Sequence, residues 1–312
     1  MRVAITGASG LIGSALLESL QRDGHEVLRL VRGKPRTPAP DEVRWNPTAG
    51  YVDVERLEGL DALVHLAATN PARPWLGNQH RSFRDSRVNG TGTIAAALAQ
   101  LVRPPQVFVC GSAIGYYGDG GDAWLDETAP LGDGYAASVV RDWEAAADPA
   151  RAAGIRVVHS RSGLVMSRRG GVLPLLTLPF RLGLGGRIGP GTQYWSGISL
   201  GDEVSALRFL IDHDKLSGPV NVAMPDPVTN AEWTEAIGRA LHRPTAVTVP
   251  RVALKIADQP LRNQATEMLL FSERIKPAAL LSAGFRFEHA DPASILAWAL
   301  KDRRPARPER SR

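Results

Sequence analysis

The sequence predicts an α/β fold, with a doubly wound parallel sheet followed by a smaller C-terminal domain. A glycine-rich turn near residue 10 joins an apolar run to an amphipathic segment, and strand-like and helix-like segments alternate over roughly the first 160 residues. Beyond this region, segments rich in glycine and proline become frequent. We therefore expect a Rossmann-type core at 1–163, a smaller substrate domain at 164–300 with some return to the Rossmann sheet, and a basic, disordered tail at 301–312.

The first elements are a strand at Val3–Ile5 and a helix that begins at Leu11. Between them, Gly7 permits a tight turn, Gly10 lets the backbone approach a phosphate, and Gly13 lets the helix pack closely on the strand. A helix N-terminus offers free N–H groups to an anion, so this turn predicts a dinucleotide site. The alternative is a purely structural turn. The residues expected to contact the cofactor here are Gly7, Ser9, Gly10, Leu11, Ile12 and Gly13.

The second strand, Glu26 to Val31, ends where a dinucleotide-binding fold selects its cofactor. An acidic residue at this point would favour NAD, but the chain has Arg32, followed by Lys34 and Arg36. Because a guanidinium binds phosphate well, these cations predict NADP(H) as the cofactor. The alternative is a solvated basic loop.

Later elements follow the same alternation. A strand at 61–66 leads into the small residues Ala67 and Ala68, a strand at 107–111 precedes Ser112, and a helix begins near Tyr135. We expect Ala67, Ala68 and Gly111 to contact the cofactor. A strand follows at 155–161, and beyond Gly163 the sequence predicts a strand at 220–223 and a helix at 231–241.

Composition excludes several classes of protein. The 312 residues are 44% hydrophobic, enough for a sizeable core, and no membrane span or signal peptide is visible. The single cysteine, Cys110, lies in an apolar run and predicts a buried thiol in a reducing cytoplasm. No zinc-ligand spacing occurs, so we expect no metal. Residues 301–312 carry six Lys or Arg and two Asp or Glu, which accounts for most of the net charge of +5, so the charge does not predict nucleic-acid binding.

Several motifs together resemble an atypical branch of the extended short-chain dehydrogenase/reductases, and more narrowly the YfcH-like epimerase family. Besides the glycine turn, they are Arg87–Thr91, Gly111–Gly118, Trp143–Glu144, Pro179–Gly186 with Gly189, Gly191 and Gln193, His242–Pro244 and Gly284–Phe287. The resemblance covers about residues 1–298. It implies an NADP-binding Rossmann domain of the NAD-dependent epimerase/dehydratase superfamily and a small C-terminal domain of unknown function that closes over a cleft.

The resemblance also implies a catalytic set. In the typical superfamily site a Ser polarises the substrate, a Tyr exchanges a proton, and a Lys four residues later holds the nicotinamide ribose and lowers the pKa of the Tyr. Ser112 and Tyr135 match the first two, but Val139 stands at the Lys position. Arg141 cannot replace that Lys, because six residues along a helix rotate a side chain by roughly 240°. Tyr135 is then expected to be a poor base but a competent proton donor, and Tyr117 is a second candidate donor.

The remaining site predictions concern contacts to substrate or anion. We expect Tyr116, Arg161 and Gln193 to contact the substrate. Tyr116 and Tyr117 precede Gly118 in a loop, where one phenol would face the substrate while the other packs. Arg87 is expected to contact the cofactor or another anion, the alternative being a structural salt bridge. Near residue 200, where relatives often carry a His and two Asp, this chain keeps only Asp202.

The function these residues predict is an NADP(H)-dependent oxidoreductase that moves hydride to or from a small carbonyl or alcohol. Two alternatives stay open. A non-catalytic NADP-binding sensor or scaffold is favoured by Val139, and a nucleotide-sugar epimerase or dehydratase is favoured by the family resemblance. We expect a small-molecule substrate, a cytoplasmic location, and no membrane or nucleic-acid partner. A homodimer is one possible assembly.

Overall fold

The computed structural model describes residues 1–32, 38–69, 79–250, 267 and 269–302. Its main sheet has eight strands in the order β14-β8-β6-β5-β1-β2-β3-β4. All neighbouring pairs are parallel except β3 with β4, which is antiparallel. The strands are β1 (Arg2–Thr6), β2 (Glu26–Val31), β3 (Glu42–Asn46), β4 (Tyr51–Val52), β5 (Ala62–His65), β6 (Val107–Ala113), β8 (Arg156–Ser162) and β14 (Gly218–Val222).

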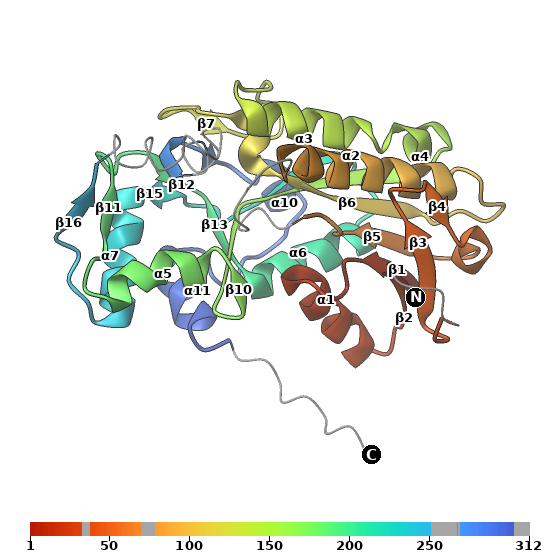
Figure 1. The fold of residues 1–312 in the computed structure, drawn as a ribbon, viewed down its shortest axis with the longest axis horizontal. Helices are drawn as coiled ribbons and strands as arrows, with labels where there is room; N and C mark the ends of the chain where they lie inside the picture. Colours follow the sequence, from red (N-terminus) through yellow and green to blue (C-terminus); the bar gives the residue numbers. More distant parts are fainter. Residues whose placement is uncertain (33–37, 70–78, 251–266, 268, 303–312) are drawn as a thin grey trace, which may run out of the picture.

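Helices cover both faces of this sheet (Figure 1). One layer holds α2 (Gln79–Leu98), α3 (Tyr135–Ala145) and α4 (Asp148–Ala152), and the other holds α1 (Leu11–Arg22) and α6 (Leu200–Asp212). Side chains along a strand point alternately to the two faces, so Val3 and Ile5 pack with the α1 and α6 side while Ala4 packs with the α2 side. Both faces are therefore buried, as a parallel sheet requires.

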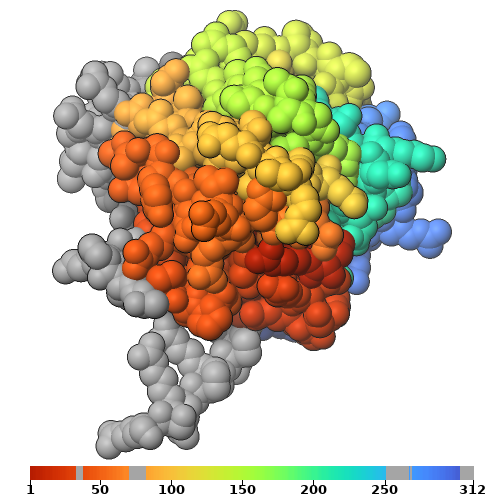
Figure 2. All heavy atoms as spheres, turned by 90° about the vertical axis from the view of Figure 1, so that its right-hand side faces the viewer, coloured from red at the N-terminus to blue at the C-terminus, as the bar shows by residue number. Residues whose placement is uncertain are grey.

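Figure 2 looks onto the β3–β4 end of the molecule. The first 60 residues, red to orange, form much of this face. The antiparallel β4 closes the sheet at this end, away from the C-terminal part of the chain.

The C-terminal part has a separate small core around Met166, Trp195, Trp233 and Leu296. Its helices are α5 (Leu173–Arg181), α7 (Asn230–Leu241), α10 (Ala278–Ser282) and α11 (Pro292–Ala299). Short strands join these helices: β9 (Leu164–Ser167) pairs with β10 (Gly170–Gly171) and β13 (Gly197–Ser199), β11 (Gly186–Ile188) with β16 (Val247–Val249), and β12 (Tyr194–Trp195) with β15 (Val228–Thr229).

Two features join this part to the main sheet. β14 pairs with β8 inside the main sheet, and β7 (Trp124–Leu125), from the N-terminal part, pairs with β17 (Arg274–Ile275). Short 3-10 helices η1 (Val54–Leu57) and η2 (Ile114–Tyr117) complete the described elements. The expected return of the C-terminal part to the main sheet is thus present, while the division into domains at 163 stays a prediction.

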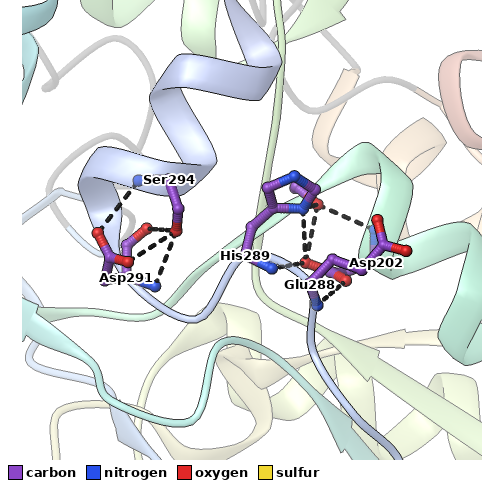
Figure 3. A network of polar contacts seen from close by, with 6 residues as sticks. Asp202, Glu288, His289, Asp291 and Ser294 are labelled. Carbon is purple, nitrogen blue, oxygen red and sulfur yellow. Dashed lines mark hydrogen bonds and ion pairs between the residues drawn. The ribbon is translucent and has the colours of Figure 1, made fainter.

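A polar network at the start of α6 also joins distant segments (Figure 3). Ser199 accepts a hydrogen bond from the Asp202 backbone N–H, which caps α6. The buried Asp202 carboxylate in turn accepts the backbone N–H groups of Glu288 and His289 and lies 3.1 Å from His289 Nδ1. The network therefore fixes the segment before α11 to the first turn of α6.

Candidate functional site

Most of the predicted site residues lie near the carboxyl edge of the main sheet. From β1 the chain adds β2 and then β3 on one side of the sheet. It then returns to the other side of β1, where it adds β5, β6 and β8, so the order in which strands are added reverses between β1 and β5. Ligands of doubly wound sheets bind outside the carboxyl ends of the strands at such a point. The turn after β1 and the exits of β5 and β6 therefore define the candidate site.

The glycine turn is so tightly packed that side chains are excluded. Gly7 has φ +69°, and a Cβ there would lie 2.8 Å from the backbone carbon of Leu66. A Cβ at Gly13 would overlap the carbonyl oxygen of Gly7. Gly10 precedes α1 without capping it by a side chain, and the first turn of α1 contains no acidic residue. The tight turn predicted at Gly7 is confirmed, and Gly13 lets α1 pack closely on Gly7 and Ala8 of the turn that follows β1.

The N-terminus of α1 fits an anionic group. Among the described residues, none accepts a hydrogen bond from the backbone N–H of Leu11, Ile12 or Gly13. Three such donors at a helix N-terminus, beside backbone that carries no Cβ at Gly7 and Gly10, suit a pyrophosphate. Ser9 is exposed at this turn, so the dinucleotide set predicted from the sequence lies together in space.

Neighbouring strand ends extend this edge on both sides. Arg32 is exposed directly after β2, two residues beyond Leu30, which pairs with Thr6 of β1. Lys34 and Arg36 lie outside the described residues. On the other side, Ala67 and Ala68 follow β5, and the Ala67 N–H donates to Thr6 Oγ1. Arg32 and the alanines thus flank the glycine turn, as the sequence predicts.

His65 lies beneath this turn. Its Nδ1 is 2.8 Å from Thr6 Oγ1, and burial lowers the pKa of His65 to about 3, so the ring is neutral. The hydroxyl of Thr6 accepts two backbone N–H groups from Leu66 and Ala67. We infer that His65 and Thr6 fix the backbone that leaves β5.

Ser112, at the end of β6, belongs to a buried polar chain. Its hydroxyl donates to Glu144 Oε1 at 2.6 Å, and Glu144 accepts two further hydrogen bonds from Nε and one terminal nitrogen of Arg161, each 2.8 Å long. Burial alone would raise the pKa of Glu144, but the hydrogen bonds and charge of Arg161 outweigh it and lower that pKa. The carboxylate is therefore ionised, and the Ser112 hydrogen points to it.

Tyr116 and Tyr117 extend the chain from η2. The Tyr117 hydroxyl accepts from Arg161 at 2.9 Å and donates to Asn221 Oδ1 at 2.7 Å, and burial raises the pKa of Tyr117 to about 12. The Arg161 guanidinium stacks 3.5 Å from the Tyr116 ring centroid. Proton donation by Tyr117 would require its bond to Asn221 to break, and Arg161 already uses Nε and both terminal nitrogens on protein acceptors. Substrate contacts by Arg161 and by the two phenols stay predictions.

Tyr135 begins α3, and its half-buried side chain lies beside the site. The carboxylate of Glu267 accepts the N–H groups of Tyr135 and Ala136, which caps this helix from the C-terminal part of the chain. Gly115 of η2 lies against Ala136, because a Cβ at Gly115 would be 3.4 Å from the Ala136 Cβ. Since α3 also packs against β6, Tyr135 and Ser112 belong to neighbouring elements. Val139, at the expected Lys position, is buried.

Arg87 of α2 is 7% exposed and donates to the carbonyls of Thr69 and Phe83. No carboxylate in the described ranges lies within ion-pair distance of Arg87, so the structural salt bridge considered as an alternative is not found there. Burial lowers the pKa of Arg87 to about 9, while the nearby Tyr135 acts to raise it. A contact from Arg87 to the cofactor stays a prediction.

Two predicted residues have other surroundings. Gly111 is buried within β6, where a Cβ would lie 3.2 Å from the carbonyl oxygen of His65 and 3.4 Å from the Trp143 ring, so packing alone favours a residue without a side chain. The Gln193 amide donates to the carbonyls of Ile188 and Leu269 in the C-terminal part, apart from the Ser112 chain. Their predicted ligand contacts stay predictions.

Cys110 is a buried free thiol in β6, as the sequence predicts. Across the described ranges, no group of three His, Cys, Asp or Glu side chains is arranged to hold a metal. The same ranges contain no helix with the length and apolar character needed to cross a membrane.

Known proteins resemble the chain along its length. Residues 3–223 match the NAD dependent epimerase/dehydratase family, and residues 249–299 match a domain of unknown function, DUF1731. Epimerase family protein ML0860 of Mycobacterium leprae is 45% identical over 299 residues, which cover 95% of each chain.

Two solved structures are also similar. The human epimerase family protein SDR39U1 (isoform 2) with NADPH has 31% identity and a TM-score of 0.83, with 96% of this chain and 99% of that chain covered. A nucleoside-diphosphate sugar epimerase from Corynebacterium glutamicum has 35% identity and a TM-score of 0.79, where 96% of this chain spans 58% of that chain.

Proposed function

The chain belongs to the NAD dependent epimerase/dehydratase family, and from this we propose that it is an NADP(H)-dependent oxidoreductase acting on a small carbonyl or alcohol. The observation that carries the proposal is the glycine turn, which lies between Arg32 and the Ser112 strand end at one edge of the sheet. A cofactor bound there would place its two ends near the cation and near the polar side chains.

The donor set supports a phosphorylated dinucleotide. The N–H groups at the start of α1 would hold the pyrophosphate, and the exposed Arg32 would hold the additional phosphate of NADP. That the human relative was solved with NADPH supports the same choice. When bound, the nicotinamide supplies the hydride chemistry, and the protein supplies position and proton exchange.

Ser112 and Tyr135 would act on the substrate oxygen. Because the Ser112 hydrogen is donated to Glu144, Ser112 Oγ faces an alcohol substrate as an acceptor and would orient its hydroxyl. A carbonyl would require the Ser112 hydrogen to rotate away from Glu144. Tyr135 would take the proton from the alcohol, or return it to the forming alkoxide.

A specific observation favours the second candidate, an NADP-binding sensor without turnover. The buried Val139 cannot supply the charge that a lysine would bring to Tyr135. Binding without turnover of any carbonyl would favour the sensor, and tightly held NAD in the purified protein would favour an epimerase.

Cofactor binding tests the proposal first. Titration with NADPH and with NADH, followed by nicotinamide fluorescence, should show at least about tenfold preference for NADPH, because a charged hydrogen bond contributes roughly 1.5–3 kcal/mol. Arg32→Asp should remove that preference. Arg22→Asp makes the same charge change at the far end of α1 and should leave it intact.

Turnover is the second arm of the same experiment. NADPH oxidation with a panel of small aldehydes and ketones should give a rate that Ser112→Ala lowers by about 100-fold while NADPH affinity stays unchanged. Equal binding of both nucleotides, or an unchanged rate in Ser112→Ala, would contradict the proposal.

A further inference from the structure

The proposed proton exchange at Tyr135 leaves a charge to be stabilised. A phenol that takes a proton from an alcohol must first be a phenolate, which needs a cation nearby. The residue four positions after Tyr135 is Val139, and its side chain is buried and uncharged. The question is therefore which other side chain reaches this face of α3.

Arg87 reaches it from α2. Tyr135, Val139 and Trp143 are spaced by four residues, so they share one face of α3. The Arg87 guanidinium lies 5.0 Å from the Trp143 ring centroid and 3.6 Å from that of Phe83, between the two packed helices. A helix surface row that carries Tyr135 at one end is thus in contact with a buried cation.

The surroundings keep Arg87 in this position without neutralising it. Its described hydrogen bonds go to the carbonyl oxygens of Thr69 and Phe83, and no carboxylate of the described chain pairs with it. Trp143 is itself fixed, because its Nε1 donates to Thr91 Oγ1 at 2.9 Å. Burial of a cation without a carboxylate is costly, so this charge is expected to serve another group.

Tyr135 is that group. Tyr135 stands in the same row of α3 that Arg87 contacts at Trp143. In agreement with this placement, a negative charge on Tyr135 acts to raise the pKa of Arg87 against the larger, lowering effect of burial. Coulomb attraction is mutual, so the Arg87 cation favours the phenolate. The charged groups that the described part of the chain brings near this end of α3 include Glu267, which caps the helix, Glu273, whose Oε1 lies 4.0 Å from the Cβ position of Gly115, and Arg84, which is paired with Asp142.

We propose that Arg87 is the positioning cation for Tyr135, supplied from α2 in place of a lysine at position 139. This assignment rests on the proposed function, since it concerns the same proton exchange. It differs from a cofactor contact in that Arg87 acts through the ionisation of Tyr135.

Direct titration of Tyr135 tests the assignment without a substrate. The protein is labelled with fluorotyrosine at its five tyrosines, and the Tyr135 fluorine resonance is identified as the one missing from Tyr135→Phe. In Arg87→Met and Arg87→Gln, the titration midpoint of this resonance should move up by about one pH unit or more. Arg87→Lys should keep it near the wild-type position.

Two further variants separate charge from packing. Arg84→Met removes a cation from the same helix pair, but Arg84 is 44% exposed and paired with Asp142, so the Tyr135 midpoint should not move. Adding Val139→Lys to Arg87→Met should return the midpoint toward the wild-type value. Melting curves identify any variant that does not fold, and the remaining neutral variant then carries the comparison.

The outcomes are distinct. A midpoint that is the same in wild type and in a folded neutral variant overturns the proposal, and so does loss of NADPH affinity with an unchanged midpoint, which would make Arg87 a cofactor contact. A shifted midpoint in a protein that turns over no carbonyl supports the assignment for Arg87 while contradicting the proposed function.

Discussion

Among single residues, two buried carboxylates near the carboxyl edge of the sheet show how local partners decide charge. Glu144 accepts two hydrogen bonds from Arg161 and one from Ser112, which lower its pKa despite burial. Glu203 of α6 accepts one hydrogen bond, from the Ser162 hydroxyl, and its Oε2 has no partner among the described residues. Burial consequently raises the pKa of Glu203 to about 7.

Glu203 therefore predicts a pH dependence of stability. In the unfolded chain this carboxyl ionises near 4.5, whereas the folded protein holds its proton up to about pH 7. As pH rises through this window the unfolded state loses its proton first, so the free energy of unfolding falls. Glu203→Gln should match wild type at pH 5 and exceed it at pH 8 by about 3 kcal/mol, measured by urea unfolding.

The matched control for this prediction is Glu26→Gln, a change at an exposed carboxylate that pairs with Arg2 at the surface. Its effect on stability should be small and nearly equal at the two pH values. A constant difference between Glu203→Gln and wild type from pH 5 to pH 8 would show that Glu203 is ionised in the folded protein throughout.

Residues that act through the backbone were predictable from sequence, whereas their side-chain partners were not. The glycines at positions 7 and 13 could be predicted to form a turn, because only glycine fits at these two positions. Glu144 lies 32 residues from Ser112 and 17 from Arg161, and no local pattern links positions on three different elements. The signal available was Arg161 itself, since a guanidinium at the end of a buried strand requires a carboxylate.

At the scale of elements, the start of α6 holds more contacts than a helix end needs. The backbone N–H of Asp202 donates to the capping hydroxyl of Ser199, and the Asp202 carboxylate accepts hydrogen bonds from the backbone N–H groups of Glu288 and His289 (Figure 3). The carboxylate is 1% exposed, so its hydrogen bonds are shielded from water. The helix N-terminus thus serves as the anchor for the segment leading into α11.

Asp202→Ala should consequently loosen a segment far from it in sequence. Loss of the carboxylate leaves two backbone donors without an acceptor, and we expect the free energy of unfolding to fall by about 2–4 kcal/mol. Hydrogen exchange followed by mass spectrometry should show faster exchange in residues 285–299. Thr229→Ala is the control, because it removes a cap of α7 that contributes about 1 kcal/mol, and the described hydrogen bonds of the Thr229 hydroxyl go only to Glu232 within the same helix. Unchanged exchange at 285–299 in Asp202→Ala would contradict the anchoring role.

Element prediction succeeded where periodicity was strong. The predicted strand Glu26–Val31 has the bounds of β2, and the helix expected from Leu11 is α1. The sequence did not predict α2 as a helix, because its first half is almost entirely polar and its apolar residues come at the end. No partner could be predicted for the strand at 220–223, which lies as β14 beside β8 at the edge of the main sheet, because strand partners far apart in sequence leave no local pattern.

At the scale of the whole molecule, the fold class and the family predicted from sequence are confirmed, but the two parts of the chain are more closely joined than the sequence suggests. β7 pairs with β17, and β14 is the edge strand of the main sheet. Asn221 of β14 accepts the Tyr117 hydroxyl and donates to the carbonyls of Leu125 and Lys276, so one side chain holds three segments. The boundary at 163 therefore separates segments of sequence whose contacts interleave.

This interleaving predicts that both parts unfold together. Pulsed hydrogen exchange at increasing urea concentrations should show that the amides of β5 and β6 lose protection at the same urea concentration as the amides of α7. A single cooperative transition requires this coincidence. Asn221→Ala, which leaves the Tyr117 hydroxyl and two carbonyls unpaired, should lower both midpoints together, because neither part keeps its packing once the shared contacts are lost. Asn46→Ala, at the exposed last residue of β3, should move neither midpoint. Exposure of α7 at a lower urea concentration than β5 and β6 would instead mean that the C-terminal part is an independent folding unit.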